Sequence, residues 1–263
     1  MPHAAGLWYE WHGPEDGEVL ILSPGLGGSA SYWQPNLPAF AERYRVLLYD
    51  HRGTGRSSPA LPDEVSIETM ASDVLALMKA LDIHHDLPYF IGHAVGGLIG
   101  LELDLTHAVL KKLVIINGWA RLDPHTARCF DVRLELLNKS GPEAYLRAQP
   151  IFLYPATWIS HFTERLDAEA EHQLSHFPPI ANVEKRIAAA RAFNLWLDAS
   201  CPVLLVASAD DMLVPVGCSQ ILMDEICNST LEVMEWGGHA CNVTRPEEFN
   251  RIVLAWLGHA DRA

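Results

Sequence analysis

A glycine-flanked turn at residues 92–96 has the arrangement that most often presents a reactive side chain. The stretch YFIGHAVGG (89–97) runs from apolar and aromatic residues through the turn into an apolar segment with helical character. A strand, a sharp turn and a helix in this order, written G-x-S-x-G, normally hold a serine nucleophile at the top of a sheet. Here Ala94 stands at the centre, and its methyl group has no lone pair with which to attack. The turn predicts a site of this kind without its usual nucleophile.

The elements that would position this turn are buried strands. Six short runs are rich in β-branched and aliphatic residues, and most are unbroken rather than alternating, which is typical of strands buried on both faces of a parallel sheet. These runs are EVLILSP (18–24), YRVLLYD (44–50), LPYFIG (87–92), KKLVIIN (111–117), CPVLLVAS (201–208) and STLEVMEW (229–236).

Helical patterns separate the predicted strands. In SIETMASDVLALMKAL (66–81), Ser66 is the expected N-cap, and apolar residues recur at helical spacing behind it. The last helix is expected from about Pro246, in PEEFNRIVLAWLGHA, with acidic residues in its first turn. The alternation predicts an α/β fold with a mostly parallel, doubly wound sheet.

Residues 119–196 break this rhythm. They contain the helical patterns TARCFDVRLELL and ANVEKRIAAARAF, joined by a connector rich in proline and aromatic residues, QPIFLYPATWISHF (149–162). Such an insertion indicates a cap over the carboxyl ends of the strands. We therefore expect residues 1–118 and 197–263 to form the core and residues 119–196 to form a helical cap.

Composition narrows the function classes. A formal charge of −14 argues against nucleic acid and anionic membranes as partners, since both need a basic surface. The five cysteines are scattered without C-x-x-C spacing, which indicates free thiols in a reducing compartment. The start, MPHAAGLWYEWHG, lacks a cationic segment followed by an apolar run, and no uncharged stretch is long enough to span a bilayer. We expect a cytoplasmic protein.

Four stretches in order resemble the α/β-hydrolase superfamily over essentially the whole chain. SPGLGGSASYW (23–33) matches the family's H-G-x-G-G region, with proline at the usual histidine, and DHRGTGRS (50–57) matches its D-x-R-G-x-G-x-S turn. The altered elbow follows, and ASADDMLVP (207–215) with GGHACNV (237–243) occupies the usual positions of the acid and the base. The resemblance implies the α/β-hydrolase fold.

The resemblance also implies roles for individual residues. The backbone amides of Leu26 and Val95 would form an oxyanion hole, and His239 would be the general base. Asp210 and Asp211 are both candidates for the acid that orients the imidazole, and the family spacing D-x-x-x-P favours Asp211.

An elbow centred on Ala94 allows three interpretations. The chain could be a degenerate hydrolase kept as a scaffold or binding protein, or an ester or amide hydrolase whose serine was replaced by engineering. The third interpretation is a native chemistry that needs no acyl-enzyme.

Further segments, several of them in the cap, resemble the RutD-type hydrolases of bacterial pyrimidine utilisation. These are IINGWAR (115–121), HTARCFDVRLELL (125–137), AQPIFLYPATW (148–158) and GGHACNVTRPEEFN (237–250). In that family the elbow also contains alanine, which favours a native Ala94. The resemblance implies hydrolysis of a small carbon–nitrogen compound from uracil degradation. The candidates are carbamate, giving ammonia and CO2, and 3-aminoacrylate, giving malonic semialdehyde and ammonia.

The remaining expectations concern the pocket and its partners. Trp119, Arg121 and Tyr154 are candidates for lining the pocket, each with a structural role as the alternative. No cluster of His, Cys or Asp has metal-ligand spacing, so neither a metal nor an organic cofactor is expected. The expected partner is a small-molecule substrate, and exposed cap aromatics would permit a homodimer.

Overall fold

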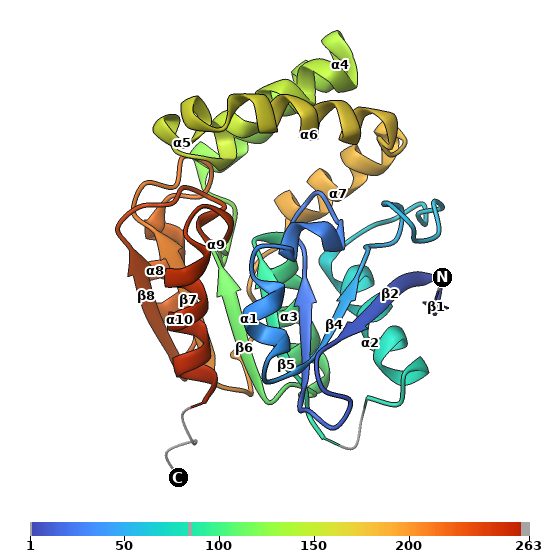
Figure 1. The fold of residues 1–263 in the computed structure, drawn as a ribbon, viewed down its shortest axis with the longest axis vertical. Coiled ribbons are helices and arrows are strands. Elements are labelled where there is room, and N and C mark those ends of the chain that lie inside the picture. The colour runs from blue at the N-terminus through green and yellow to red at the C-terminus, as the bar shows by residue number, and fades with distance from the viewer. Residues whose placement is uncertain (1, 84–85, 259–263) are drawn as a thin grey trace.

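The strands form one eight-stranded sheet in the order β1-β2-β4-β3-β5-β6-β7-β8 (Figure 1). The structure is a computed structural model that describes residues 2–83 and 86–258. The strands are β1 (His3–Ala4), β2 (Leu7–His12), β3 (Val19–Ser23), β4 (Arg45–Tyr49), β5 (Tyr89–His93), β6 (Lys112–Ile116), β7 (Val203–Ser208) and β8 (Ser229–Met234). All six predicted strands are present, as β3 to β8, and all neighbours among them pair in parallel.

The two strands that the hydrophobic pattern missed, β1 and β2, lie at one edge of the sheet. Both of their pairings are antiparallel, β1 with β2 and β2 with β4. The sequence of β2, LWYEWH, includes polar residues, and four of its six positions are only partly buried. A search for continuous apolar runs overlooks such an edge strand.

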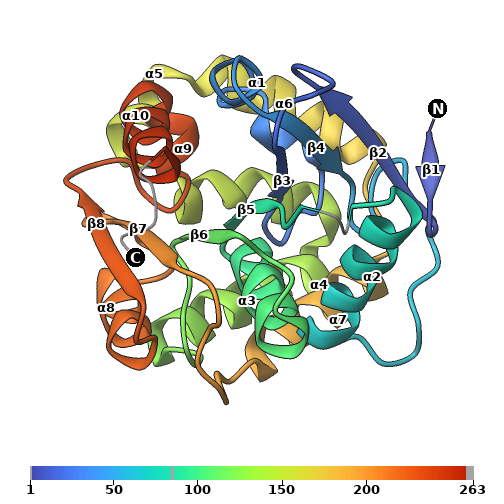
Figure 2. The ribbon, with the colours of Figure 1, turned by 90° about the horizontal axis from the view of Figure 1, so that it is seen from below.

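Helices cover both faces of the sheet, as the view from below shows (Figure 2). The core helices are η1 (Ala30–Trp33), α1 (Leu37–Ala41), α2 (Ile67–Ala80), α3 (Val95–His107), α8 (Val216–Glu225), α9 (Cys241–Thr244) and α10 (Pro246–Leu257). One hydrophobic cluster joins α2, α3 and α8 to the sheet, and a second joins α1 and α10 to its other face. The structure thus has the predicted doubly wound α/β architecture.

Local signals place two of these helices as predicted. Ser66 caps α2, because its side chain accepts the Thr69 N–H while the Thr69 hydroxyl accepts the Ser66 N–H. Pro246 begins α10, which ends at Leu257, and the last residues of the predicted stretch lie outside the described residues.

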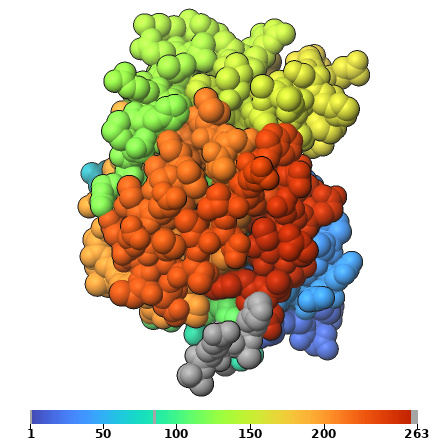
Figure 3. All heavy atoms as spheres, turned by 90° about the vertical axis from the view of Figure 1, so that its left-hand side faces the viewer, coloured from blue at the N-terminus to red at the C-terminus, as the bar shows by residue number. Residues whose placement is uncertain are grey.

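Four helices stand between β6 and β7 in the chain and lie over the carboxyl ends of the strands (Figures 1 and 3). They are α4 (Pro124–Leu153), α5 (Ala156–His161), α6 (Thr163–Ser175) and α7 (Ile180–Ala192). We call them the cap helices. The carboxyl ends of parallel strands are where such sheets bind ligands, so the cap covers the expected site.

The structure corrects the interpretation of residues 149–162 as a connector, because most of them are helical. They form the end of α4 and the whole of α5. Pro150 is accommodated inside α4, and its carbonyl accepts the Tyr154 N–H at 2.9 Å. Earlier in α4, Gly141 has φ of 84° and interrupts the helix, and Pro142 begins the second half. Proline content was therefore a misleading sign here.

The length and apolar character of the helices bear on membrane crossing. Among the residues that the structure describes, no helix combines the length and the apolar character that a bilayer span requires.

Candidate active site

The elbow keeps its strained geometry although it has no serine. Ala94 lies between β5 and α3 with φ of 47° and ψ of −112°, a region that residues other than glycine rarely adopt. The turn is this sharp because glycines flank it at close contact. A Cβ on Gly96 would lie 2.4 Å from the Ser23 carbonyl oxygen, and one on Gly92 would lie 2.2 Å from the Gly96 carbonyl carbon. The packing that usually presents a nucleophile is therefore intact around Ala94.

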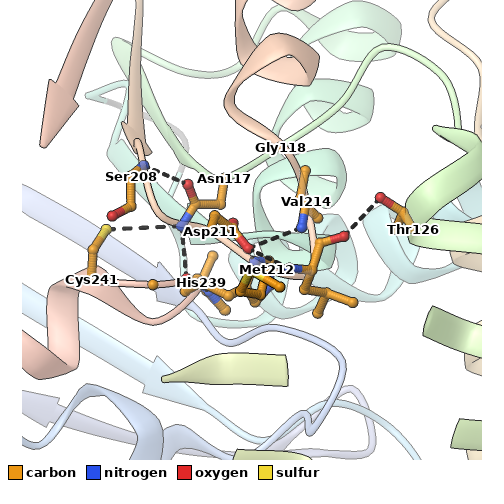
Figure 4. Close-up of polar contacts among 12 residues, drawn as sticks. Asn117, Gly118, Thr126, Ser208, Asp211, Met212, Val214, His239 and Cys241 are labelled. Carbon is orange, nitrogen blue, oxygen red and sulfur yellow. Dashed lines mark hydrogen bonds and ion pairs between the residues drawn. The ribbon is translucent and has the colours of Figure 1, made fainter. Parts of the chain in front are cut away.

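His239 is held by Asp211 in the loop region that follows β7 and β8 (Figure 4). The His239 Nδ1 lies 2.8 Å from Asp211 Oδ2, and both side chains are buried, at 3% and 0% exposure. Asp211 Oδ1 accepts the amide N–H groups of Leu213 and Val214 at 2.7 and 2.9 Å. Three donors thus hold the carboxylate, which makes Nδ1 the donor to Asp211. The Nε2 of His239 has no hydrogen-bond partner in the described part of the chain, so it is available to exchange a proton.

Asp210, the other candidate acid, holds the histidine loop instead. Its Oδ1 accepts the Ser208 hydroxyl at 2.7 Å and the amide N–H groups of Gly237 and Gly238 at 2.9 and 2.8 Å. The residue in contact with the imidazole is therefore Asp211, as the spacing to Pro215 favoured.

The two candidate oxyanion amides have no internal acceptor. Within residues 2–83 and 86–258, no hydrogen bond joins the N–H of Leu26 or of Val95 to another group. Val95 is the first residue of α3, where unpaired amides favour negative charge. The loop that contains Leu26 is held by Arg186 of α7, whose Nη1 donates to the Leu26 carbonyl at 3.1 Å. Free amides on a braced loop and at a helix start are the features that an oxyanion hole requires.

Two residues that the sequence did not mark, His93 and Asn117, connect the elbow and the end of β6 to the loop of His239. The His93 ring lies with its centroid 4.7 Å from that of His239 and stacks on Tyr32, also at 4.7 Å. His93 Nε2 lies 2.9 Å from the His239 carbonyl oxygen, and since a carbonyl can only accept, Nε2 carries the proton. The Asn117 side chain donates to the same oxygen at 2.7 Å. His93 and Asn117 therefore fix the backbone of His239 from beneath.

The protonation of His93 follows from its surroundings. Burial, together with the nearby His239, lowers the pKa of His93 well below its usual value. Its Nδ1 is buried and has no hydrogen-bond partner in the part of the chain that is described. The position of His93 next to the elbow centre was the one sequence signal that could have marked it.

The predicted pocket residues have different surroundings. Trp119 is 2% exposed, and its indole N–H is buried without a partner among the described residues. Tyr154 lies against Trp158 with ring centroids 4.4 Å apart, and burial raises the pKa of Tyr154 to about 12. Burial, and after it the nearby Tyr154, raises the pKa of Tyr32 well above its usual value.

Arg121 does not fit a pocket-lining role. Its side chain is 56% exposed and forms an ion pair with Glu225 of α8, on the outside of the core. An isolated antiparallel bridge between Arg121 and Asn194 joins the two ends of the cap insertion. The prediction for Arg121 is therefore corrected.

The side chains were expected to offer no metal site. Within the described residues, no group of three or more His, Cys, Asp or Glu side chains is placed to hold a metal ion.

Comparison with known proteins places the chain in a family. The model of the family described as "Alpha/beta hydrolase family" matches residues 19–252. A protein of Caulobacter sp. (strain K31) named "Putative carbamate hydrolase RutD" is 48% identical over 258 residues, which cover 96% of each chain. A protein of the same name from Agrobacterium fabrum is 46% identical over 262 residues, covering 97% of this chain and 100% of that protein.

Solved structures support the fold. The enol-lactonase from Burkholderia xenovorans LB400 superposes with a TM-score of 0.85 at 24% identity, covering 96% of both chains. MGS-M2, an alpha/beta hydrolase enzyme from a Medee basin deep-sea metagenome library, has a TM-score of 0.88 at 20% identity, covering 98% of this chain and 96% of its own. The chain therefore belongs to the alpha/beta hydrolase family and, within it, to the RutD group.

Proposed function

We propose that this chain hydrolyses a small carbon–nitrogen compound formed in pyrimidine degradation, either carbamate or 3-aminoacrylate. Relatives that are about 48% identical over nearly the whole chain have the carbamate hydrolase name. The observation that carries the proposal is the buried pair of His239 and Asp211, which leaves Nε2 of the imidazole free. Such a pair supports proton transfer, while Ala94 offers no atom for covalent attack.

Neither substrate requires an acyl-enzyme. Serine chemistry is useful when an acyl group must be held covalently while a poor leaving group departs. Carbamate separates into ammonia and CO2 once its nitrogen is protonated. The enamine 3-aminoacrylate takes a proton on C2 to give an iminium ion, water adds to C3, and ammonia leaves to give malonic semialdehyde.

In this scheme His239 supplies and removes protons, and Asp211 stabilises the imidazolium that forms. The methyl group of Ala94 leaves space where a serine hydroxyl would stand, and a water molecule or the substrate occupies that space. The amides of Leu26 and Val95 bind one oxygen of the substrate carboxylate. General acid–base catalysis of this kind contributes about 10²–10⁴-fold, which suffices when the spontaneous reaction is already fast.

The test measures ammonia release from freshly generated 3-aminoacrylate and, separately, from carbamate. The wild type should release ammonia from one of them faster than the spontaneous reaction does, and His239→Ala should return the rate to the spontaneous value. His172→Ala, at an exposed cap histidine, is the matched control and should behave as wild type. A wild type that accelerates neither reaction would support the scaffold interpretation instead.

The retained strain of the elbow favours a second candidate, an ester or amide hydrolase that has lost its serine. Ala94→Ser tests it with a short activated ester. A strong burst of alcohol release would support this candidate, whereas its absence would leave proton transfer as the chemistry of the site.

A further inference from the structure

Two arginines of the cap helices are buried without an acidic partner. Arg133 of α4 is 5% exposed and Arg186 of α7 is 2% exposed. Among the described residues, no carboxylate lies within ion-pairing distance of either guanidinium. Burying a charge without a counter-ion is unfavourable, so each of these arginines needs an explanation. The two arginines must be explained separately, because their hydrogen bonds differ.

Arg186 already uses both ends of its guanidinium. Its Nη1 donates to the Leu26 carbonyl at 3.1 Å, and its Nη2 donates to the Gly53 carbonyl at 3.0 Å. The contact with the loop is close, since a Cβ on Gly28 would lie 2.7 Å from Arg186 Nη1. Both terminal nitrogens of Arg186 thus donate to backbone carbonyls, and Arg186 positions the loop that contains Leu26, although its Nε is also buried without a partner among the described residues.

Arg133, by contrast, has donors to spare. Only its Nη2 has a hydrogen-bond partner in the described part of the chain, the Tyr145 hydroxyl at 2.7 Å, and its Nε is buried without one. The rings of Tyr145, Phe152 and Phe130 surround the guanidinium with centroids 5.1, 5.8 and 6.0 Å from Cζ. Aromatic faces stabilise the positive charge, but they leave the in-plane N–H groups unsatisfied.

The first half of α4, which contains Arg133, is attached to the Asp211 loop. Its buried face also includes Thr126 and Cys129, and the Thr126 hydroxyl donates to the carbonyl of Leu213, in the loop that contains Asp211. Burial raises the pKa of the Cys129 thiol, the charge of Arg133 lowers it, and Asp211 raises it. The Cys129 Sγ lies 3.8 Å from the carbonyl oxygen of Met212, the residue that follows Asp211, so the face of α4 that contains Arg133 packs against the Asp211 loop.

The end of α4 is attached to the loop that contains His239. Phe152, which contacts Arg133, precedes Leu153, and the Leu153 carbonyl accepts the N–H of Ala240 at 3.0 Å. Ala240 directly follows His239. Both ends of α4 are therefore fastened to loops that hold the Asp211–His239 pair, and Arg133 lies on the face between them.

We propose that Arg133 binds the carboxylate of the substrate and selects small monocarboxylates over neutral compounds of the same shape. The inference rests on the proposed function, since both candidate substrates are carboxylates. A guanidinium with free N–H groups matches a carboxylate in shape and charge, and a bound carboxylate neutralises the buried charge. The need is clear from the whole chain, whose formal charge of −14 repels anions unless a local cation attracts them.

The test uses two ligands of similar shape that are not the proposed substrates, propionate and propionamide, and an ammonia assay checks that propionamide stays intact during the titration. Their dissociation constants are measured by calorimetry or by NMR titration of the wild type, Arg133→Met and Arg133→Lys. The wild type should prefer propionate, Arg133→Met should bind propionate about ten- to a hundredfold more weakly and lose the preference, and Arg133→Lys should fall between them. Arg147→Met, at an exposed cap arginine paired with Glu143, should match the wild type.

Thermal unfolding separates ligand binding from a structural role. Without ligand, Arg133→Met should unfold at the wild-type temperature or above it, because a buried charge without a counter-ion has been removed. The stabilisation by propionate should disappear in this variant only. If Arg133→Met did not fold, Arg133→Lys would carry the test through its weaker preference for propionate.

The proposal is overturned if the wild type binds propionate and propionamide equally, or if Arg133→Met and Arg133→Lys keep the wild-type preference. The preference is a ratio of two dissociation constants and requires no turnover, so this result is independent of the proposed function. A wild type that prefers propionate yet accelerates neither ammonia-releasing reaction would contradict the proposed function and leave the carboxylate site standing.

Discussion

The loop of His239 and the elbow of Ala94 meet at the candidate active site, but they retain different features of it. The loop retains its side-chain contacts, and the elbow retains its backbone geometry. On the histidine side, the bond to Asp211 and the backbone contacts from Asn117 and His93 are all present. On the elbow side, the strained backbone and close glycine packing remain, but the reactive atom is absent. The histidine side has a side chain that can exchange protons, whereas the elbow has the backbone shape but no nucleophile. This difference is the basis of the proposal that the site transfers protons and forms no covalent bond to its substrate.

The largest expected effect concerns the shape of the elbow. Gly96→Ala places a methyl group 2.4 Å from the Ser23 carbonyl oxygen, a backbone atom that cannot move aside cheaply. The expected loss is about 3 kcal/mol of unfolding free energy, measured by urea denaturation. The control is Gly217→Ala in α8, where nothing lies within 4 Å of the added Cβ and no loss is expected. A stable Gly96→Ala protein would show that the elbow packing is looser than described.

The second effect compares neighbouring acids on the histidine side. Asp211 uses both oxygens, one for backbone amides and one for His239, so an asparagine at 211 would present an NH2 group to one of these donors. Asp211→Asn should remove about 10²-fold or more of the acceleration of ammonia release.

Asp210→Asn is the matched control for that experiment. All three donors to Asp210 reach the same oxygen, Oδ1, and an amide oxygen can accept them equally well. Its rate should stay close to that of the wild type. Equal losses in the two variants would mean that Asp211 acts only by holding the loop.

The third effect is acid sensitivity, which should arise on the elbow side. His51 contacts the loop that contains Leu26, since its N–H donates to the Gly28 carbonyl at 2.8 Å. Burial and then the charge of Arg186 lower the pKa of His51 from 6.5 to about 3. Between pH 6.5 and about pH 3, His51 binds a proton in the unfolded chain but not in the folded chain. The contribution of neutral His51 to stability is therefore fully present above about pH 6.5 and is lost as pH falls. One such proton changes the unfolding free energy by about 1.4 kcal/mol per pH unit.

His51→Asn should make the fall in stability between pH 6 and pH 4 shallower by up to that one-proton slope. Denaturant unfolding at several pH values measures it, with His172→Asn at an exposed position as the control. An unchanged slope in His51→Asn would place the acid sensitivity elsewhere.

The sequence predicted the parts of the molecule that follow from local pattern. The six parallel strands, the Ser66 cap and the start of α10 were all marked by apolar runs or capping residues. Four motifs in order gave the family, and the spacing to Pro215 singled out Asp211.

What the sequence did not show depends on contacts between distant segments. Strand β2, near the edge of the sheet, includes polar residues, and it is recognised as a strand by its pairing with β4. The support of His239 by His93 and Asn117 joins residues more than a hundred positions apart. Arg121 was a candidate pocket residue because it lies in the predicted cap, but its side chain is mostly exposed and pairs with Glu225 of α8. Such roles are set by tertiary packing, and no local pattern carries them.

The most direct measurement compares the two regions on one reaction, with ammonia release as the readout on whichever substrate the wild type accelerates. His239→Ala should abolish the acceleration, while Ala94→Ser, which restores the missing hydroxyl, should leave it nearly unchanged. The account would be contradicted by full activity in His239→Ala, or by a large gain in Ala94→Ser accompanied by a covalent adduct in the mass spectrum of the protein.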